Sequence, residues 1–91
     1  MNLQFLKEKT KFVALFEATG DFNLHLERPS AGAIYLQVRG TSQGKYDSVK
    51  NVSMSDADLI FDSDFTALVY PKYIRIVSDV EPTMAVVTFA E

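Results

Sequence analysis

The stretch FTALVYPKYIRIVSDVEPTMAVVTFA, residues 65–90, contains three apolar runs that are rich in β-branched and aromatic residues. Tyr70 and Pro71 separate the first two runs, and residues 79–82 separate the last two. Proline has no N–H for a strand ladder, so Pro71 and Pro82 indicate strand ends or turns. The stretch therefore predicts successive strands, and the separation of the last two runs is short enough for a hairpin.

Alternation of side chains supports this interpretation, because successive residues of a strand point to opposite faces. In residues 73–78, Ile74 and Ile76 share one face, and Arg75 lies on the other. Residues 84–89 have little polarity on either face. This last run is therefore predicted to be a strand that is central in its sheet or covered on both faces.

The same two-residue alternation of side chains appears earlier in the chain. Residues 22–27 alternate between apolar and polar side chains, residues 28–32 form a turn signal, and residues 34–39 alternate again. These two runs predict an antiparallel hairpin with one solvated face. Further strands are predicted in residues 3–6, 12–16, 46–52 and 59–61.

About seven or eight short strands at roughly ten-residue spacing are typical of a sandwich or barrel. A helix over residues 3–16 is the alternative near the start, but its apolar positions fit that period only in part. At 91 residues the chain is expected to be one domain. We predict an all-β fold, a small antiparallel β-sandwich that is immunoglobulin-like or jelly-roll-like. Residues 11–91 form the sandwich, and residues 1–10 form an amino-terminal arm or an edge strand.

Composition excludes several functions. The chain has no cysteine, which excludes a disulfide scaffold, thiolate metal sites and a cysteine nucleophile. Its net charge of −3 argues against nucleic acid or an anionic membrane as a partner. No apolar run is long enough to span a bilayer, and the first residues lack the pattern of a secretory signal.

His25 is the only histidine, and it lies on the polar face of residues 22–27. No known nucleophile motif accompanies it. One histidine without cysteine also does not make a typical zinc site. We therefore interpret His25 as a surface residue without a catalytic role, whose replacement has little effect on stability.

Four aspartates, Asp56, Asp58, Asp62 and Asp64, form the most acidic part of the chain. Carboxylates two residues apart share one face of a strand, and calcium prefers several oxygen ligands. The apolar residues 59–61 separate the two pairs, however, and the EF-hand spacing is missing. We interpret these charges as protection for the edge of a short apolar strand, and we predict no metal site and no cofactor.

Four tyrosines, Tyr35, Tyr46, Tyr70 and Tyr73, could form a platform for stacking sugar rings. Such platforms often use tryptophan, and the chain has none. Aromatic side chains serve equally well in a core. A core or corner role is the favoured interpretation for Tyr70 and Tyr73.

The first residues suggest an arm with one apolar edge, because Met1, Leu3 and Phe5 alternate before the polar run KEKTK, residues 7–11. Two arrangements remain open. The arm can pair as an edge strand of its own sandwich, or it can add a strand to a neighbouring chain. The second arrangement makes Leu3, Phe5 and Leu6 the candidate contacts with a partner.

The short apolar arm, the KEKTK bridge, the small sandwich and the run YPKYIRIV, residues 70–77, together resemble small auxiliary virion proteins. These are the decoration or cement proteins on the capsids of tailed bacteriophages, among them the crAss-like group. The resemblance implies a non-enzymatic protein that docks on a capsid shell and stabilises it. It implies the major capsid protein or other virion proteins as partners, a possible homo-oligomer, and a place in the virion after assembly in the host cytoplasm.

The residues leave one other function open, a free-standing β-sandwich module that binds carbohydrate or peptide. An enzyme is the least favoured class, because the set of acid–base and nucleophilic residues is so small.

Overall fold

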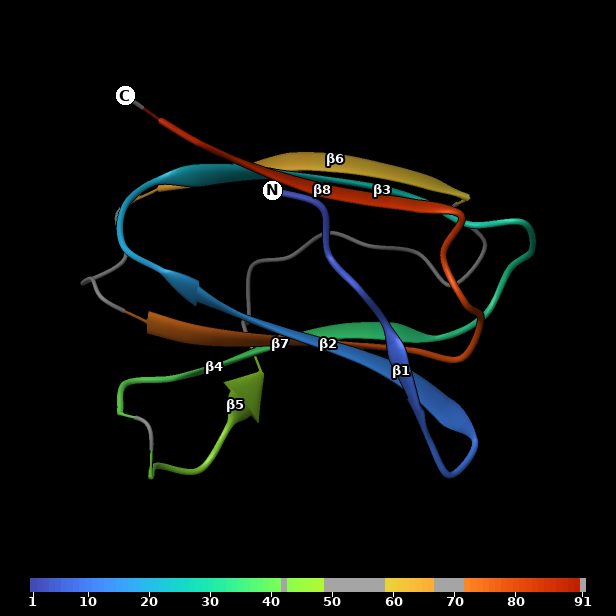
Figure 1. Cartoon of the computed structure of the whole chain (residues 1–91), viewed down its shortest axis with the longest axis horizontal. Helices are drawn as coiled ribbons and strands as arrows, with labels where there is room; N and C mark the ends of the chain where they lie inside the picture. Colours follow the sequence, from blue (N-terminus) through green and yellow to red (C-terminus); the bar gives the residue numbers. More distant parts are fainter. Residues whose placement is uncertain (42, 49–58, 67–71, 91) are drawn as a thin grey trace.

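The computed structural model describes residues 1–41, 43–48, 59–66 and 72–90, which form two packed β-sheets (Figure 1). All strand pairs are antiparallel, and the sheet orders are β1-β2-β7-β4-β5 and β6-β3-β8. The strands are β1 (Leu6–Glu8), β2 (Lys11–Ala18), β3 (Phe22–Glu27), β4 (Ile34–Arg39), β5 (Asp47–Ser48), β6 (Ile60–Phe65), β7 (Lys72–Ser78) and β8 (Met84–Phe89). This arrangement confirms the prediction of a small all-β sandwich.

The core lies between the sheets and follows the predicted alternation. In the five-stranded sheet, Ile76 lies between Ala14 and Leu36 in the strand register, and all three are buried. In the three-stranded sheet, Leu24 and Val87 are opposite each other and fully buried. The predicted alternation is therefore confirmed in these strands, because period 2 is a property of the extended backbone itself.

Phe22 is the centre of an aromatic cluster. Its ring meets Phe16 of the opposite sheet edge-to-face at a centroid distance of 5.3 Å and stacks on Phe65 at 4.9 Å. Phe89 lies at 6.3 Å in a tilted arrangement. Such pairs add stabilisation to that of the buried area alone, so the cluster ties β2, β3, β6 and β8 together.

The hairpin predicted from residues 22–27 and 34–39 is wrong, and the hairpin that the short separation of the last two runs permits does not form. β3 and β4 lie in different sheets, since β3 pairs with β6 and β8 whereas β4 pairs with β7 and β5. β7 and β8 also lie in different sheets. The connecting segments cross the edge of the sandwich, and buried Arg28 stabilises the first crossing by donating a hydrogen bond from Nη1 to the Gly32 carbonyl, 2.6 Å away. A short polar connection can lead to a strand of the opposite sheet as readily as it can form a hairpin turn within one sheet.

β8 also differs from its prediction. It is the last strand of its sheet and is not covered on both faces, because Met84 and Thr88 on its outer side are exposed. Its free edge is partly paired by the first residues of the chain. The low polarity of this strand therefore reflects one buried face, with apolar residues tolerated on the other.

The amino-terminal arm pairs with its own sandwich, which is the first of the two arrangements left open. Met1 and Val87 exchange backbone hydrogen bonds of 2.7 and 2.8 Å, and the Leu3 N–H donates to the Ala85 carbonyl at 2.9 Å. The chain then crosses to the other sheet, where β1 pairs with β2 (Figure 1). The KEKTK run, described above as a bridge, therefore contains part of β1, the turn that follows it and the first residue of β2.

Several predicted features lie outside the described residues. They are most of the weak strand predicted for residues 46–52, of which β5 is the described part, residues 67–69 of the apolar run that begins at Phe65, and the single residues Asp56, Asp58, Tyr70 and Pro71.

Candidate docking surfaces

An apolar row crosses the outer face of the five-stranded sheet. The strand register places Leu6 opposite Val13, Val13 opposite Val77, and Val77 opposite Tyr35, so the row spans β1, β2, β7 and β4. Leu6 is 71% exposed and Tyr35 is 51% exposed. Leu15, two residues further along β2, is 61% exposed on the same face. Val13 is only 8% exposed and Val77 is half-buried, so the exposed part of this set is Leu6, Leu15 and Tyr35. These five residues are called the apolar row below.

Charged and polar side chains border this row. A groove of about 640 Å³ runs beside it, lined by Val13 and Val77 and by residues that include Glu8, Lys11 and Arg75. Lys11 forms an ion pair with Asp79, which raises the pKa of Lys11 and lowers that of Asp79. An apolar centre with a polar rim is the usual anatomy of a protein–protein interface.

The sequence did not identify this surface. Its candidate contacts were Leu3, Phe5 and Leu6, and the structure packs Leu3 and Phe5 half-buried against the protein's own core. Only Leu6 stays exposed, and it belongs to the apolar row. The available signal was the apolar type of Val13, Leu15 and Val77 at positions that point away from the core.

The tyrosines do not form a common platform among the described residues. The guanidinium groups of Arg39 and Arg75 lie over the Tyr46 ring, 4.4 and 4.1 Å from its centroid. The Arg39 group also lies 5.7 Å from the centroid of Tyr73. These cation–π contacts occupy the surface on which a sugar would stack. Among the three described tyrosines, Tyr35 is the exposed one.

A polar cluster lies on the outer face of the three-stranded sheet. His25 Nδ1 lies 2.8 Å from Asp62 Oδ2, and Nε2 lies 2.7 Å from Glu27 Oε2. Asn23 Nδ2 donates to Asp62 Oδ1 at 2.8 Å and to Asp64 Oδ1 at 2.9 Å. Because both ring nitrogens of His25 contact carboxylates and neither contacts a hydroxyl, the geometry is not that of a Ser–His–Asp triad.

These contacts favour the charged form of each partner. Hydrogen bonds to Glu27 and then to Asp62 raise the pKa of His25 above its usual value. Hydrogen bonds from Asn23 and then from His25 lower the pKa of Asp62. A neutral imidazole has one N–H, so only the imidazolium donates to both carboxylates. The sequence indicated that His25 lies on the polar face of its strand, but it did not identify Asp62 of β6 as its partner.

The cluster gives a prediction about pH. A raised pKa of His25 in the folded state stabilises the fold fully below about pH 6.5, and this contribution is lost as the pH rises through the raised pKa. The lowered pKa of Asp62 acts in the opposite direction, and its contribution is lost below about pH 4. We expect the melting temperature of the parent to exceed that of His25→Gln at mildly acidic pH, by a margin that shrinks towards about pH 9. Thermal melts at several pH values measure this margin, and a constant margin would contradict the prediction.

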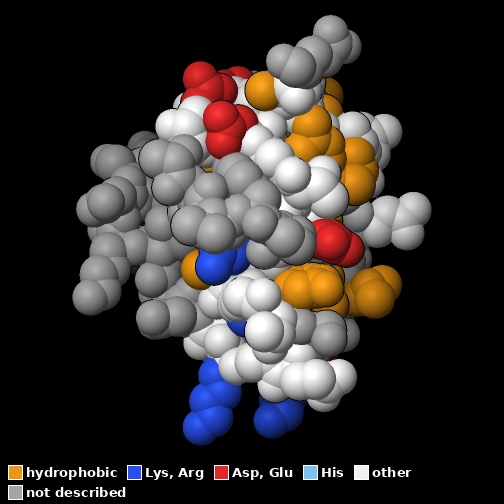
Figure 2. Space-filling model, turned by 90° about the vertical axis from the view of Figure 1, so that its left-hand side faces the viewer, with side chains coloured by type: hydrophobic (Ala, Val, Ile, Leu, Met, Phe, Trp, Pro, Cys, Tyr) orange, Lys and Arg blue, Asp and Glu red, His pale blue; other side chains and the backbone are white. Residues whose placement is uncertain are grey.

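The strands of the two sheets differ in charge, since those of the five-stranded sheet carry both basic and acidic residues. The strands of the three-stranded sheet carry Glu27, Asp62 and Asp64 and no lysine or arginine. Figure 2 shows one end of the sandwich, with Asp and Glu side chains at the top, on the side of this sheet, and one more at mid-height, whereas Lys and Arg side chains lie at the centre and at the bottom. Within the described residues, no three His, Asp or Glu side chains are grouped so that they could hold a metal ion.

No described part of the chain forms a helix of the length and apolarity needed to cross a membrane. No protein-family model, curated protein or solved structure matches the chain.

Proposed function

We propose that this chain is a non-enzymatic structural protein of a tailed-phage virion, a decoration protein that docks on the capsid shell and stabilises it. The observation that supports this function is the apolar row, whose most exposed members are Leu6, Leu15 and Tyr35. Large apolar side chains gathered on one face are typical of a protein-binding surface. The sequence resemblance to auxiliary virion proteins supplies the identity of the partner, the major capsid protein or another protein of the shell.

The fold suits such a role physically. A rigid sheet presents Leu15 and Tyr35 without needing to order a loop on binding, which reduces the entropic cost of docking. A shell offers the same site many times, so a modest interface on each copy is sufficient when copies also contact one another. In this proposal the protein is assembled in the host cytoplasm and resides in the virion.

The test begins with particles from cells that produce the chain. We expect the chain to sediment with the particles in a density gradient. Particles stripped of it are then mixed with purified parent protein or with the double variant Leu15→Ser/Tyr35→Ser. Both side chains are more than half exposed, so the variant should keep its fold while its retention on particles falls about tenfold or more.

Ile60→Ser is the matched control, because Ile60 is 64% exposed on the outer face of the other sheet. Its retention should equal that of the parent. Equal losses for both variants would show that docking does not use the apolar row. A chain that never sediments with particles would exclude the virion role altogether.

The second candidate is a module that binds carbohydrate or peptide, and the exposed ring of Tyr35 is the observation that favours it. Sugar rings stack on such a face. Retention of the parent on immobilised glycans, lost in Tyr35→Ser but kept in Leu15→Ser, would identify this function instead.

A further inference from the structure

The connection between the arm and the sandwich is a tight turn. Glu8 of β1 pairs with Lys11 of β2, so only Lys9 and Thr10 form the turn. Lys9 has a φ of 55°, in the left-handed region that residues with a Cβ disfavour. A two-residue hairpin turn with positive φ at its first central position normally has glycine there. The turn therefore holds strain that an extended link would release.

The arm is attached at exposed edges. Residues 1–3 form three backbone hydrogen bonds with β8, and β1 pairs with the outermost side of β2. Leu3 and Phe5 are half-buried, not enclosed. Detachment of the arm would thus leave the pairing of β2 with β7 and of β8 with β3 intact.

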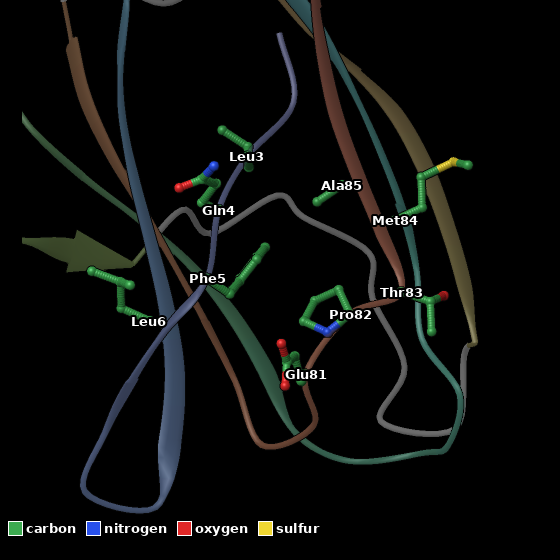
Figure 3. A pocket seen from close by; sticks show the side chains of 9 residues that line it. All are labelled: Leu3, Gln4, Phe5, Leu6, Glu81, Pro82, Thr83, Met84 and Ala85. Carbon is green, nitrogen blue, oxygen red and sulfur yellow. The ribbon is translucent and has the colours of Figure 1, made fainter.

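A groove separates the arm from β8 beyond Leu3. It measures about 340 Å³ and is lined by the side chains shown in Figure 3, which come from residues 3–6 and residues 81–85. The arm leaves β8 at Leu3, and the Phe5 side chain points toward Pro82 across the groove, whereas that of Gln4 points to the other side of the arm. Solvent therefore reaches the junction at which the arm would begin to separate from the sandwich.

We propose that residues 1–8 exchange between two copies of this chain, with the turn at Lys9 and Thr10 opened into an extended link. The arm of each copy then pairs with β8 and β2 of the other. The backbone pairings of the arm within the described residues are all with residues beyond the turn, so a second copy offers the same pairings, and the strain at Lys9 is released. A short, strained hinge is the feature that favours such swapping. This inference does not depend on the virion role.

A disulfide reports which copy supplies the arm. Asn2 and Val86 are opposite each other in an isolated antiparallel bridge, and the chain has no cysteine of its own. The double variant Asn2→Cys/Val86→Cys is concentrated, oxidised, separated by size exclusion and analysed on non-reducing gels. We expect a monomer fraction with an internal disulfide and a dimer fraction that stays covalently dimeric in denaturant.

Two changes at the hinge should act in opposite directions in this background. Lys9→Gly accommodates the positive φ and should lower the dimer association constant on the order of tenfold. Thr10→Pro disfavours the observed conformation of Lys9 and should raise the dimer fraction. Lys45→Gly, a lysine-to-glycine change between β4 and β5, is the matched control and should change nothing.

Melting curves of each variant verify that it is folded. A dimer whose disulfides are all internal would overturn the proposal and point to another interface, such as the apolar row. Monomer alone at millimolar concentration, with Thr10→Pro folded and monomeric, would also overturn it.

Discussion

Replacing Leu24 with alanine is expected to lower the free energy of unfolding by about 3–5 kcal/mol. Leu24 is fully buried at the middle of β3, opposite Val87 of β8. The substitution removes apolar contact area and leaves a cavity between two sheets whose backbones are held by strand pairing. A domain of this size has only about 5–15 kcal/mol of total stability, so the effect is large.

Leu15→Ala provides the same chemical change at an exposed position of β2, on the outer face. It should change the free energy of unfolding by no more than about 0.5 kcal/mol. Urea titrations of both variants, with equal slopes, compare them directly. Similar losses at the two positions would mean that the outer face of the five-stranded sheet is packed like a core.

Deleting residues 1–6 is expected to have the second largest effect, a loss of about 2–4 kcal/mol. Leu3 and Phe5 each contribute about half of the 1.5–3 kcal/mol of a fully buried apolar side chain. The three backbone hydrogen bonds to β8 add about 0.5–1.5 kcal/mol each, and the cost of ordering the segment offsets part of the sum. The melting temperature of the dilute monomer should fall accordingly.

Leu6→Ser tests whether this loss comes from the packed part of the arm, since Leu6 points outward and is 71% exposed. It should leave the melting temperature nearly unchanged. If the deletion left the melting temperature unchanged and abolished association with a partner, the arm would belong to a neighbouring chain, as the second arrangement suggested by the sequence requires.

Which residues face the core could be predicted from the sequence. Ile74 and Ile76 share one face as their alternation predicted, and that face is buried, while His25 lies on the outer face of β3. Strand pairing could not be predicted in the same way. The segment between β3 and β4 has the composition of a turn, yet it crosses between the sheets, because a polar connection of that length serves both purposes.

The candidate surfaces also depend on strand pairing that the sequence does not reveal. The sequence indicated that Val13 and Val77 are apolar and point away from Ala14 and Ile76, but not that they are opposite each other, 64 positions apart in the chain (77 − 13). The contact of His25 with Asp62 likewise depends on the pairing of β3 with β6.

Alternation follows from the geometry of a single extended chain, so the sequence by itself determines the face on which a side chain lies. The partner and register of each strand minimise the free energy of the whole sandwich, since each pairing must bury all inward faces at once. The tertiary structure alone therefore decided that four separate strands place their outward apolar residues in one row, and that the arm closes on its own edge.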